Sequence, residues 1–490
     1  MLKNTTIFLF ILFLSIPLVA EESNLGTGTT RPNILLVISD DHGYPHVGVY
    51  GDPNVKTPNL DRFAAEGMTF RRAYVTAPQC VQSRAGIFAA RSQVGIGMSR
   101  FSAPFPAEIK SFPEYLRDAG FYTGLAGRSY HMEGEDGLGG PIRQADGTYE
   151  YKRFSSRYDY AKSASGQGLV AINNTLKQFS EFLDLVPKEK PFFLQLCFHD
   201  PHAPYDNEEI PEPSDPDKLI LPSWCPDIPF IRKAHADYYN EVNRFDQSFG
   251  KVLEELDKRS LKENTLVIFI GDNGASILRG KGSLYESGIH VPLLVRWTGK
   301  ILPGSISSEL VSGEDIGATC LAAAGITPPI EWTSQSFLPI LFGEKDASVR
   351  NYIFAARGPH GFGLPTDIQS FDLSRTIVGK QYKLIYNPLW QIPYSYYAKG
   401  PKWIEIQNAA KEGKVPPSIA SLYTGENRSM FEVYDLQNDP DELENLSGKK
   451  ETAAIELQLK RELRNWMIAE QDFVPLPLQR ELPVSPQKNR

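Results

Sequence analysis

The stretch Ile34-Leu35-Leu36-Val37-Ile38, followed by Ser39-Asp40-Asp41-His42-Gly43, decides the fold. Five consecutive apolar residues predict a β-strand that is buried on both faces, because a half-exposed strand would alternate apolar and polar residues. The polar residues after it predict a turn at the carboxyl end of this strand. Two neighbouring acids in that turn are the first candidates for a functional site.

Two later segments repeat this design, and together they define the fold class. Residues 192–198 end at His199-Asp200-Pro201-His202, and residues 266–270 end at Gly271-Asp272-Asn273-Gly274. A fourth strand is expected at 291–295, and helices are expected at 57–63, 111–119 and 234–257. Apolar strands that alternate with helices predict an α/β fold with a large, mainly parallel sheet flanked by helices.

The last third of the chain has a different pattern. Strand candidates at 352–355, 382–386 and 431–436, with a polar helix at 450–469, predict a smaller C-terminal α+β domain containing an antiparallel sheet. Residues 387–428 are rich in Pro, Tyr and Lys and are expected to be a surface insertion. The predicted limits are a signal peptide (1–20), a larger domain (23–345), a C-terminal subdomain (346–472) and a Pro-rich tail (473–490).

Composition and the N-terminus restrict the class of protein. Of the 490 residues, 41% are hydrophobic and 22% are charged, which is a globular composition and excludes disorder. A net charge of −8 argues against a nucleic-acid-binding protein. The apolar run at 7–20 follows Lys3 and is too short to span a membrane, so it predicts a secretory signal peptide. We expect a secreted or periplasmic protein with no stable membrane insertion after cleavage.

The acids at the strand ends suggest a metal site. Asp40, Asp41, Asp272 and Asn273 follow two buried strands, and ligands of α/β sheets gather at the carboxyl ends of strands. Three carboxylates and one amide carbonyl are hard oxygen donors, which suit Ca²⁺ or Mg²⁺ better than Zn²⁺. Either pair alone would be interpreted as a turn or a helix cap. Their occurrence after both strands favours the metal site.

Six short motifs, in a fixed order along the chain, carry a family resemblance. They are Arg31-Pro32-Asn33-Ile34, residues 80–91 beginning Cys80-Val81-Gln82-Ser83-Arg84, Gly127-Arg128-Ser129-Tyr130-His131, Gly271-Asp272-Asn273-Gly274, residues 280–286 and Val433-Tyr434-Asp435-Leu436 with Asp439-Pro440. In this combination the chain resembles the type I (formylglycine-dependent) sulfatases of the alkaline-phosphatase superfamily, and is most similar to their sulfamidase (heparan N-sulfatase)-like branch. The resemblance implies that residues 23–345 are the catalytic domain.

The resemblance also implies a chemistry. Cys80 would be oxidised to formylglycine by a formylglycine-generating enzyme, and its hydrate would attack sulfur. The formylglycine would join the oxygen donors above in binding the cation, with Ca²⁺ preferred over Mg²⁺. The other implied roles are to hold the formylglycine (Arg84), to keep positive charge near it (Arg128), to accept its proton (His131), to protonate the leaving group (His202) and to bind sulfate (Lys281, with His202).

Two positions depart from the family pattern. Gln82 stands where the family usually has Pro and sometimes Ala, and Phe88-Ala89-Ala90 stands where it has Leu-Thr-Gly. The converting enzyme reads this segment in an extended form, which Pro favours by fixing φ and Gln does not. The nature of Gln82 therefore bears on whether Cys80 is converted.

Three functions follow from these features. The first is an exported sulfatase that removes O- or N-linked sulfate from a sulfated poly- or oligosaccharide. The second is a phosphodiester or phosphonate monoester hydrolase of the same superfamily, since tetrahedral phosphate fits a similar site. The third is a catalytically silent glycan-binding protein that retains Cys80 as a thiol. Candidate sugar contacts are Arg143, Arg153 and Arg157, and the aromatic residues of 387–428.

Overall fold

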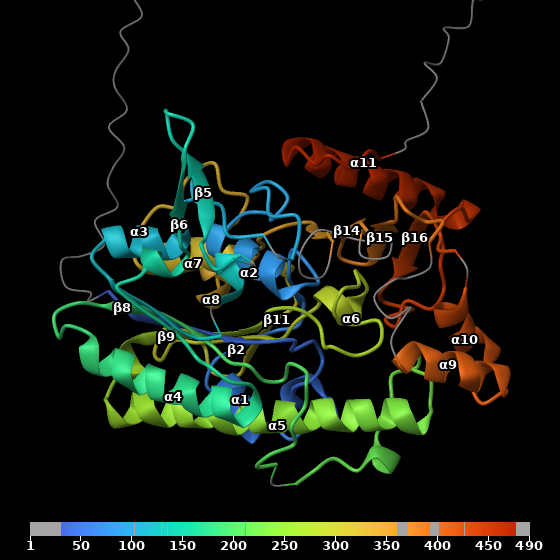
Figure 1. Cartoon of the computed structure of the whole chain (residues 1–490), viewed down its shortest axis with the longest axis horizontal. Coiled ribbons are helices and arrows are strands. Elements are labelled where there is room, and N and C mark those ends of the chain that lie inside the picture. Colours follow the sequence, from blue (N-terminus) through green and yellow to red (C-terminus); the bar gives the residue numbers. More distant parts are fainter. Residues whose placement is uncertain are drawn as a thin grey trace, which may run out of the picture. The chain divides into compact units, whose positions relative to one another are not determined.

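An eight-stranded sheet organises the larger part of the fold (Figure 1). The computed structural model describes residues 31–101, 103–128, 130–134, 136–210, 212–359, 371–392, 401–425 and 427–476. The predicted signal peptide and the tail beyond residue 476 lie outside these residues. The strands of the large sheet are β1 (Asn33–Ser39), β2 (Met68–Phe70), β4 (Tyr122–Gly127), β7 (Tyr160–Ser163), β8 (Phe192–Cys197), β9 (Thr265–Gly271), β10 (Leu293–Arg296) and β11 (Ser305–Ser307).

The order of these strands confirms the predicted fold class. They lie in the order β11-β2-β10-β9-β1-β8-β4-β7. β1 pairs in parallel with β8 on one side and with β9 on the other, and β4 pairs in parallel with β8 and β7. The fourth predicted strand is present as β10, which runs antiparallel to both β9 and β2. The sheet is therefore mixed and mainly parallel.

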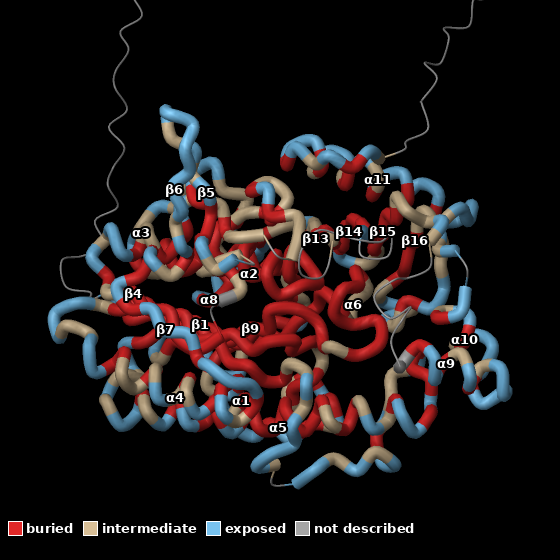
Figure 2. Tube along the Cα trace, viewed as in Figure 1, coloured by how far each residue is buried: buried red, intermediate tan, exposed pale blue. Residues whose placement is uncertain are grey.

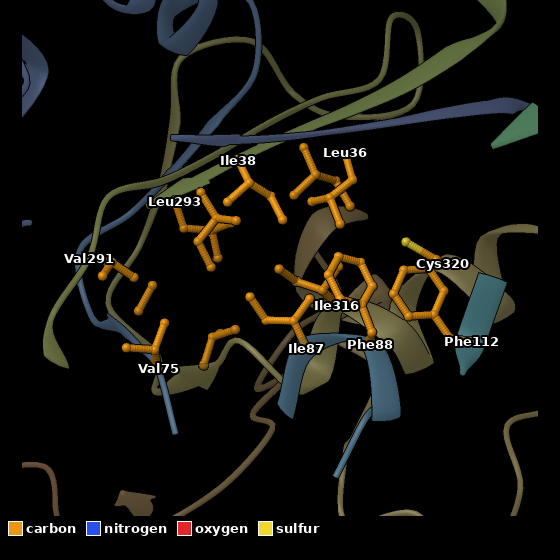
Figure 3. Packing of buried hydrophobic residues seen from close by; sticks show 14 of the residues in the cluster. Leu36, Ile38, Val75, Ile87, Phe88, Phe112, Val291, Leu293, Ile316 and Cys320 are labelled. Atoms are coloured by element: carbon orange, nitrogen blue, oxygen red, sulfur yellow. The ribbon is translucent and has the colours of Figure 1, made fainter. Parts of the chain in front are cut away.

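Helices cover both faces of this sheet (Figure 1). Alternate residues of β1 point to opposite faces, as the two-residue period of a strand requires. Leu35 and Val37 belong to a buried cluster with helices α1 (Pro58–Ala65), α4 (Gly168–Leu185) and α5 (Pro229–Lys258). Leu36 and Ile38 pack on the other side with helices α2 (Cys80–Ala89), α3 (Phe112–Asp118) and α7 (Asp315–Ala323) (Figure 3). Such burial on both faces explains why residues 34–38 are all apolar, and β1 is coloured as buried in Figure 2.

A second sheet follows in the C-terminal part. Its strands β13 (Ile353–Arg357), β14 (Ser374–Val378), β15 (Tyr382–Tyr386) and β16 (Phe431–Asp435) pair antiparallel in chain order. Helix α11 (Ala453–Ala469) packs Leu459, Leu463 and Met467 against it. The antiparallel sheet and its helix are confirmed, and β14 is a strand that the sequence pattern did not indicate. The residue limits of the predicted domains stay predictions.

The remaining elements are short. Two small sheets pair β3 (Ala73–Tyr74) with β12 (Val311–Ser312), and β5 (Gly140–Arg143) with β6 (Tyr149–Lys152). Helices α6 (Glu286–Ile289) and α8 (Leu338–Leu341) are single turns. In the part of the chain that the structure describes, we find no helix with the length and apolar character that crossing a membrane requires.

The predicted surface insertion is more ordered than its composition indicated. Within residues 387–428 the chain forms helices α9 (Pro401–Lys411) and α10 (Pro417–Thr424). Trp403, Ile406 and Tyr423 are buried in one cluster with Tyr238 and Tyr239 of α5. Composition alone predicts a surface insertion, and the spacing of Trp403 and Ile406 on one helical face creates an apolar stripe that packs in this cluster.

Candidate active site

Polar residues from adjacent strands meet at one edge of the large sheet. β9, β1 and β8 are neighbours, so their carboxyl ends lie side by side. The Asp272 N–H donates to the Ser39 carbonyl (3.1 Å), and the Asp40 N–H donates to the Asp200 carbonyl (3.3 Å). These backbone hydrogen bonds join the ends of the three strands.

The four predicted oxygen donors form one buried cluster. The Asp41 N–H donates to Asp272 Oδ1 (2.9 Å), and Asn273 Nδ2 donates to Asp41 Oδ1 (2.8 Å). Asp40, Asp41, Asp272 and Asn273 are all 0% exposed. Asp41 has a left-handed φ of 62°, which Asp tolerates better than most residues and which turns the chain directly after β1. This turn allows two consecutive acids to serve one site.

The donor set fits a hard divalent cation. Among the described residues, Asp40 Oδ1, Asp41 Oδ2 and Asn273 Oδ1 are buried oxygen atoms that accept no hydrogen bond. Leaving such atoms without a partner is costly, so a cation that they share would stabilise them. Ligand atoms of Asp40, Cys80 and Asp272 lie within 4.8 Å of one another. The same holds for ligand atoms of Asp40, Asp41 and His202.

The acids perturb one another strongly. Burial, followed by the charge of Asp40, raises the pKa of Asp272 to about 7, against the opposing effect of Arg84. Burial would also raise the pKa of Asp40, but Arg128 and other nearby cations hold it well below its usual range. Crowded carboxylates of this kind favour an additional positive charge in the cluster.

Three basic side chains surround the acids. Arg84 Nε lies 2.8 Å from Asp272 Oδ2, and Arg84 Nη2 lies 3.3 Å from Asp40 Oδ2. Lys281 Nζ lies 2.7 Å from Asp41 Oδ1. Arg84 and Lys281 thus contact all three acids of the cluster. Arg128 is the third basic side chain, so the numbers of basic and acidic side chains are equal. A site with equal numbers of fixed positive and negative side chains can accept an anionic group when a divalent cation is bound.

Gly127 explains how Arg128 enters the site. Gly127 ends β4 with a φ of 85°, and a Cβ atom there would lie 2.0 Å from the Cys197 carbonyl oxygen. Only glycine fits both conditions. The turn directs Arg128 inward, where its Nε lies 2.7 Å from Asp40 Oδ2.

Cys80 is the first residue of α2 and is 0% exposed. Burial raises the pKa of its thiol to about 12, while the charge of Lys281 opposes this shift and the nearby acids add to it. Ser83, one turn further on, donates its hydroxyl to the Asp272 carbonyl. The first turn of α2 is therefore fixed to the end of β9, which holds residue 80 beside the oxygen cluster.

Two histidines complete the site. His131 Nε2 lies 3.4 Å from Arg128 Nη2, and burial followed by the charge of Arg128 lowers the pKa of His131 well below its usual value. His202 Nε2 lies 3.3 Å from Arg128 Nη2 and 3.7 Å from Asp41 Oδ2. Burial lowers the pKa of His202 to about 4, although Asp41 opposes this. Both imidazoles are thus neutral near pH 7 and able to accept a proton.

The structure brings all ten predicted site residues together, and it also clarifies neighbouring residues. His42 lies between Ser39 Oγ (3.1 Å) and the His46 carbonyl (2.8 Å), so it has a structural role. His199 was not predicted, yet its ring centroid lies 5.4 Å from that of His202. Arg157 is 1% exposed and pairs with Glu114 at 2.6 Å, so it cannot serve as the sugar contact that we considered.

A cavity of about 670 Å³ lies apart from this site. None of the ten predicted site residues lines it. Its wall includes His46 paired with Asp52 (2.6 Å) and His290 paired with Glu286 (3.2 Å). The imidazole of His290 also stacks on Tyr44 at 3.9 Å. These polar groups of the cavity wall are engaged with one another.

Comparison with known proteins assigns the family. Residues 32–326 match the sulfatase family model, and residues 278–390 match the model of the N-sulphoglucosamine sulphohydrolase C-terminal region. The chain belongs to the sulfatase family of hydrolases.

Curated relatives cover most of the chain. An ulvan-active sulfatase from Formosa agariphila is 29% identical over 91% of this chain and 81% of its own length. The human N-sulphoglucosamine sulphohydrolase is 27% identical over 90% of this chain and 91% of its own length.

Solved structures share the fold. A protein in complex with its substrate D-glucosamine-2-N,6-O-disulfate superimposes with a TM-score of 0.64 at 20% identity, covering 91% of this chain and 99% of its own. A phosphonate monoester hydrolase of Agrobacterium radiobacter gives a TM-score of 0.67 at 18% identity, covering 90% and 96%.

Proposed function

We propose that this chain is an exported sulfatase that hydrolyses an O- or N-linked sulfate of a sulfated carbohydrate. The proposed nucleophile is a formylglycine formed from Cys80, next to a divalent cation, Ca²⁺ rather than Mg²⁺. The observation that carries the proposal is the position of Cys80, whose Sγ lies within 4.8 Å of carboxylate oxygens of Asp40 and Asp272. The substrate class is supported by the relatives, which are named for ulvan and for N-sulphoglucosamine.

The unmodified residue is a poor nucleophile. The reactive form of cysteine is the thiolate, and burial raises the pKa of the Cys80 thiol to about 12. An aldehyde hydrate at this position would present two hydroxyl groups to the site. One hydroxyl attacks sulfur and displaces the alcohol or amine. Loss of a proton from the other reforms the aldehyde and releases sulfate, so one difficult displacement becomes two easier steps.

The basic side chains stabilise the sulfate. Lys281 and Arg128 contact two different acids of the cluster. Lys281 Nζ lies 2.7 Å from Asp41 Oδ1, and Arg128 Nε lies 2.7 Å from Asp40 Oδ2. Their ammonium and guanidinium groups would donate to the sulfate oxygens as charge develops. A cation held by Asp40, Asp41, Asp272 and Asn273 would supply further positive charge at the sulfate and the nucleophile.

The two histidines move protons. His131 is neutral and would accept the proton of the attacking hydroxyl. His202 would donate a proton to the leaving oxygen or nitrogen, and its Nε2 is the atom that faces the acids. A bound sulfate would add negative charge beside His202, which would oppose the lowering of its pKa by burial. General acid–base groups contribute about 10²–10⁴-fold each.

The test combines mass spectrometry with kinetics on protein from the native host. We expect formylglycine in the peptide covering residues 73–91, and desulfation of at least one defined sulfated oligosaccharide. Cys80→Ala should abolish activity, and chelation should do so reversibly, with Ca²⁺ restoring more activity than Mg²⁺. Faster hydrolysis of an aryl phosphate than of the matching aryl sulfate would favour the phosphohydrolase. Unmodified Cys80 with no desulfation would favour the silent glycan-binding protein.

Export is tested separately. If the predicted signal peptide is cleaved after residue 20, the mature chain begins at Glu21. N-terminal sequencing of protein from the cell envelope or the medium tests this expectation.

A further inference from the structure

The His202 ring is not oriented by a hydrogen bond between its Nδ1 atom and another described residue. Its Nε2 faces Arg128 and Asp41, while Nδ1 has no hydrogen-bond partner among the residues that the structure describes. Histidines that transfer protons are commonly oriented by a bond to the second ring nitrogen. Here the ring is oriented by the contact of Nε2 with Arg128 and by the loop that carries His202.

One side chain of a distant helix holds this loop on both sides of His202. Arg244 projects from α5 and is 2% exposed. Before His202, its Nε and Nη2 donate to the two carboxylate oxygens of Asp200, at 2.7 and 3.0 Å. After His202, its Nη1 donates to the Asp206 carboxylate and, at 2.9 Å, to the Glu208 carbonyl. A planar guanidinium suits such simultaneous contacts, whereas an ammonium group does not.

A third carboxyl group, that of Glu241, lies beside Arg244. Glu241 Oε1 lies 3.2 Å from Arg244 Nη2 and accepts the Asp206 N–H at 3.0 Å. Burial and the charge of Asp200 raise the pKa of Glu241 to about 9, so Glu241 is neutral near pH 7. Arg244 pairs with two carboxylates, Asp200 before His202 and Asp206 after it.

The same loop is also tied to the metal-binding cluster. The Asp200 carbonyl accepts the Asp40 N–H at 3.3 Å, and the His202 N–H donates to the His199 carbonyl at 3.0 Å. Fixing Asp200 thus restricts the distance between His202 and the two acids that follow β1, Asp40 and Asp41.

We infer that Arg244 is the positioning residue for His202, and that it holds the imidazole where it can protonate the leaving group. The inference rests on the proposed sulfatase function and assigns a role to a residue outside the site. Misplacement of a catalytic group by about 1 Å can cost about 10²-fold in rate. The loss of Arg244 should therefore act on the proton-transfer step.

The experiment compares leaving groups. 4-Nitrophenyl sulfate releases a stable anion that needs little protonation, whereas a sulfated disaccharide releases an alcohol or amine that must be protonated. The disaccharide is the one that the wild-type protein desulfates fastest. For Arg244→Met we expect kcat to fall about 10²-fold on the disaccharide and less than about tenfold on 4-nitrophenyl sulfate, with KM little changed. Arg244→Lys should recover part of the loss, since it retains the charge without the fork.

Two further variants make the role specific. His202→Ala should show the same selective loss, and the double variant should be no slower than His202→Ala, because both act on one step. Arg259→Met is the matched control at the C-terminal end of α5, directly after its last residue, since Arg259 pairs with Asp184 and is 27% exposed at its side chain. It should leave kcat and KM unchanged on both substrates.

The outcomes separate the inference from the function on which it rests. Equal losses on both substrates by folded Arg244→Met, or additive losses in the double variant, would overturn the positioning role while leaving the sulfatase intact. A wild-type protein that desulfates neither substrate would overturn the proposed function as well. Where Arg244→Met does not fold, Asp206→Asn weakens the contact that Arg244 makes after His202. This variant must also lose more kcat on the disaccharide than on 4-nitrophenyl sulfate.

Discussion

Gln82 is a buried polar residue at a critical point of the chain. It is the third residue of α2, two positions after Cys80, and is 1% exposed. Within the described part of the chain, neither the nitrogen nor the oxygen of its side-chain amide has a hydrogen-bond partner. An unsatisfied buried amide costs about 1–3 kcal/mol. The side chain of Gln82 therefore contributes no hydrogen bond to the described part of the fold.

Gln82→Pro should fold and should increase conversion of Cys80. The backbone N–H groups of a first helical turn have no partner within the helix, so Pro loses no helical hydrogen bond there. Pro also favours the extended form that the converting enzyme reads. We expect an unchanged or higher melting temperature and a larger formylglycine fraction, measured by peptide mass spectrometry in a host that contains the converting enzyme.

Gln82→Ala separates the two effects. It removes the amide without fixing φ, so it should share the stability of the Pro variant but not its increased conversion. Equal conversion in wild type, Ala and Pro variants would show that position 82 does not control the modification.

Residues at strand ends were predictable, whereas residues brought in by packing were not. Asp40, Asp41, Asp272 and Asn273 could be placed together because buried strands of a parallel sheet end at one edge. Cys80 and Arg84 enter from a helix, and only the family resemblance indicated them. Arg244 lies in an amphipathic helix where nothing local distinguishes a clamp from a surface arginine. Its role depends on Asp200 and Asp206, which lie about 40 residues earlier.

Helix α9 shows the corresponding limit at the scale of an element. The abundance of Pro, Tyr and Lys in residues 387–428 predicted a surface insertion, and composition carries no information about a partner. The partner is α5, whose Tyr238 and Tyr239 share a buried cluster with Trp403 and Ile406. The long apolar strands could be predicted from their own sequence, whereas the burial of this short helix depends on tertiary packing that the local sequence does not show.

Ile406→Ala should therefore destabilise the protein although it lies in a region that resembles a loop. Ile406 is 0% exposed, and truncating a buried isoleucine costs about 2–5 kcal/mol. Ile404 on the same helix is 54% exposed, so Ile404→Ala should change the unfolding free energy by less than about 0.5 kcal/mol. Urea unfolding of both variants measures the difference. Equal costs would mean that α9 does not pack on α5 in solution.

At the scale of the whole molecule, a buried lysine connects the C-terminal sheet to the loop that carries Lys281. Lys383 lies on β15 with a 0% exposed side chain. Its Nζ lies 3.0 Å from Glu286 Oε1 and 2.8 Å from Glu442 Oε1. Glu286 is the first residue of α6, five positions after Lys281. One charge in the second sheet thus helps to hold the loop that carries Lys281.

Lys383→Met should lower the unfolding free energy by about 3–5 kcal/mol, because it removes the lysine from the buried carboxylate of Glu442 and from the partly buried carboxylate of Glu286. Lys380→Met is the control, since Lys380 is 60% exposed and lies 3.5 Å from Glu309. A surface pair of that kind contributes about 0–1 kcal/mol. Chemical denaturation at pH 7 compares the two variants, and equal costs would show that the buried lysine contributes no more than a surface pair.

The pH dependence of Lys383→Met identifies the cause of its instability. Burial already raises the pKa of Glu442 to about 7 while Lys383 opposes this shift, and burial would raise the pKa of Glu286 if Lys383 did not hold it low. Without the lysine both pKa values rise, so the folded variant binds more protons than the unfolded chain as the pH falls below neutral. Its stability deficit relative to wild type should therefore shrink between pH 7 and pH 5. A deficit that stays constant over this range would assign the loss to packing of the lysine side chain rather than to its charge.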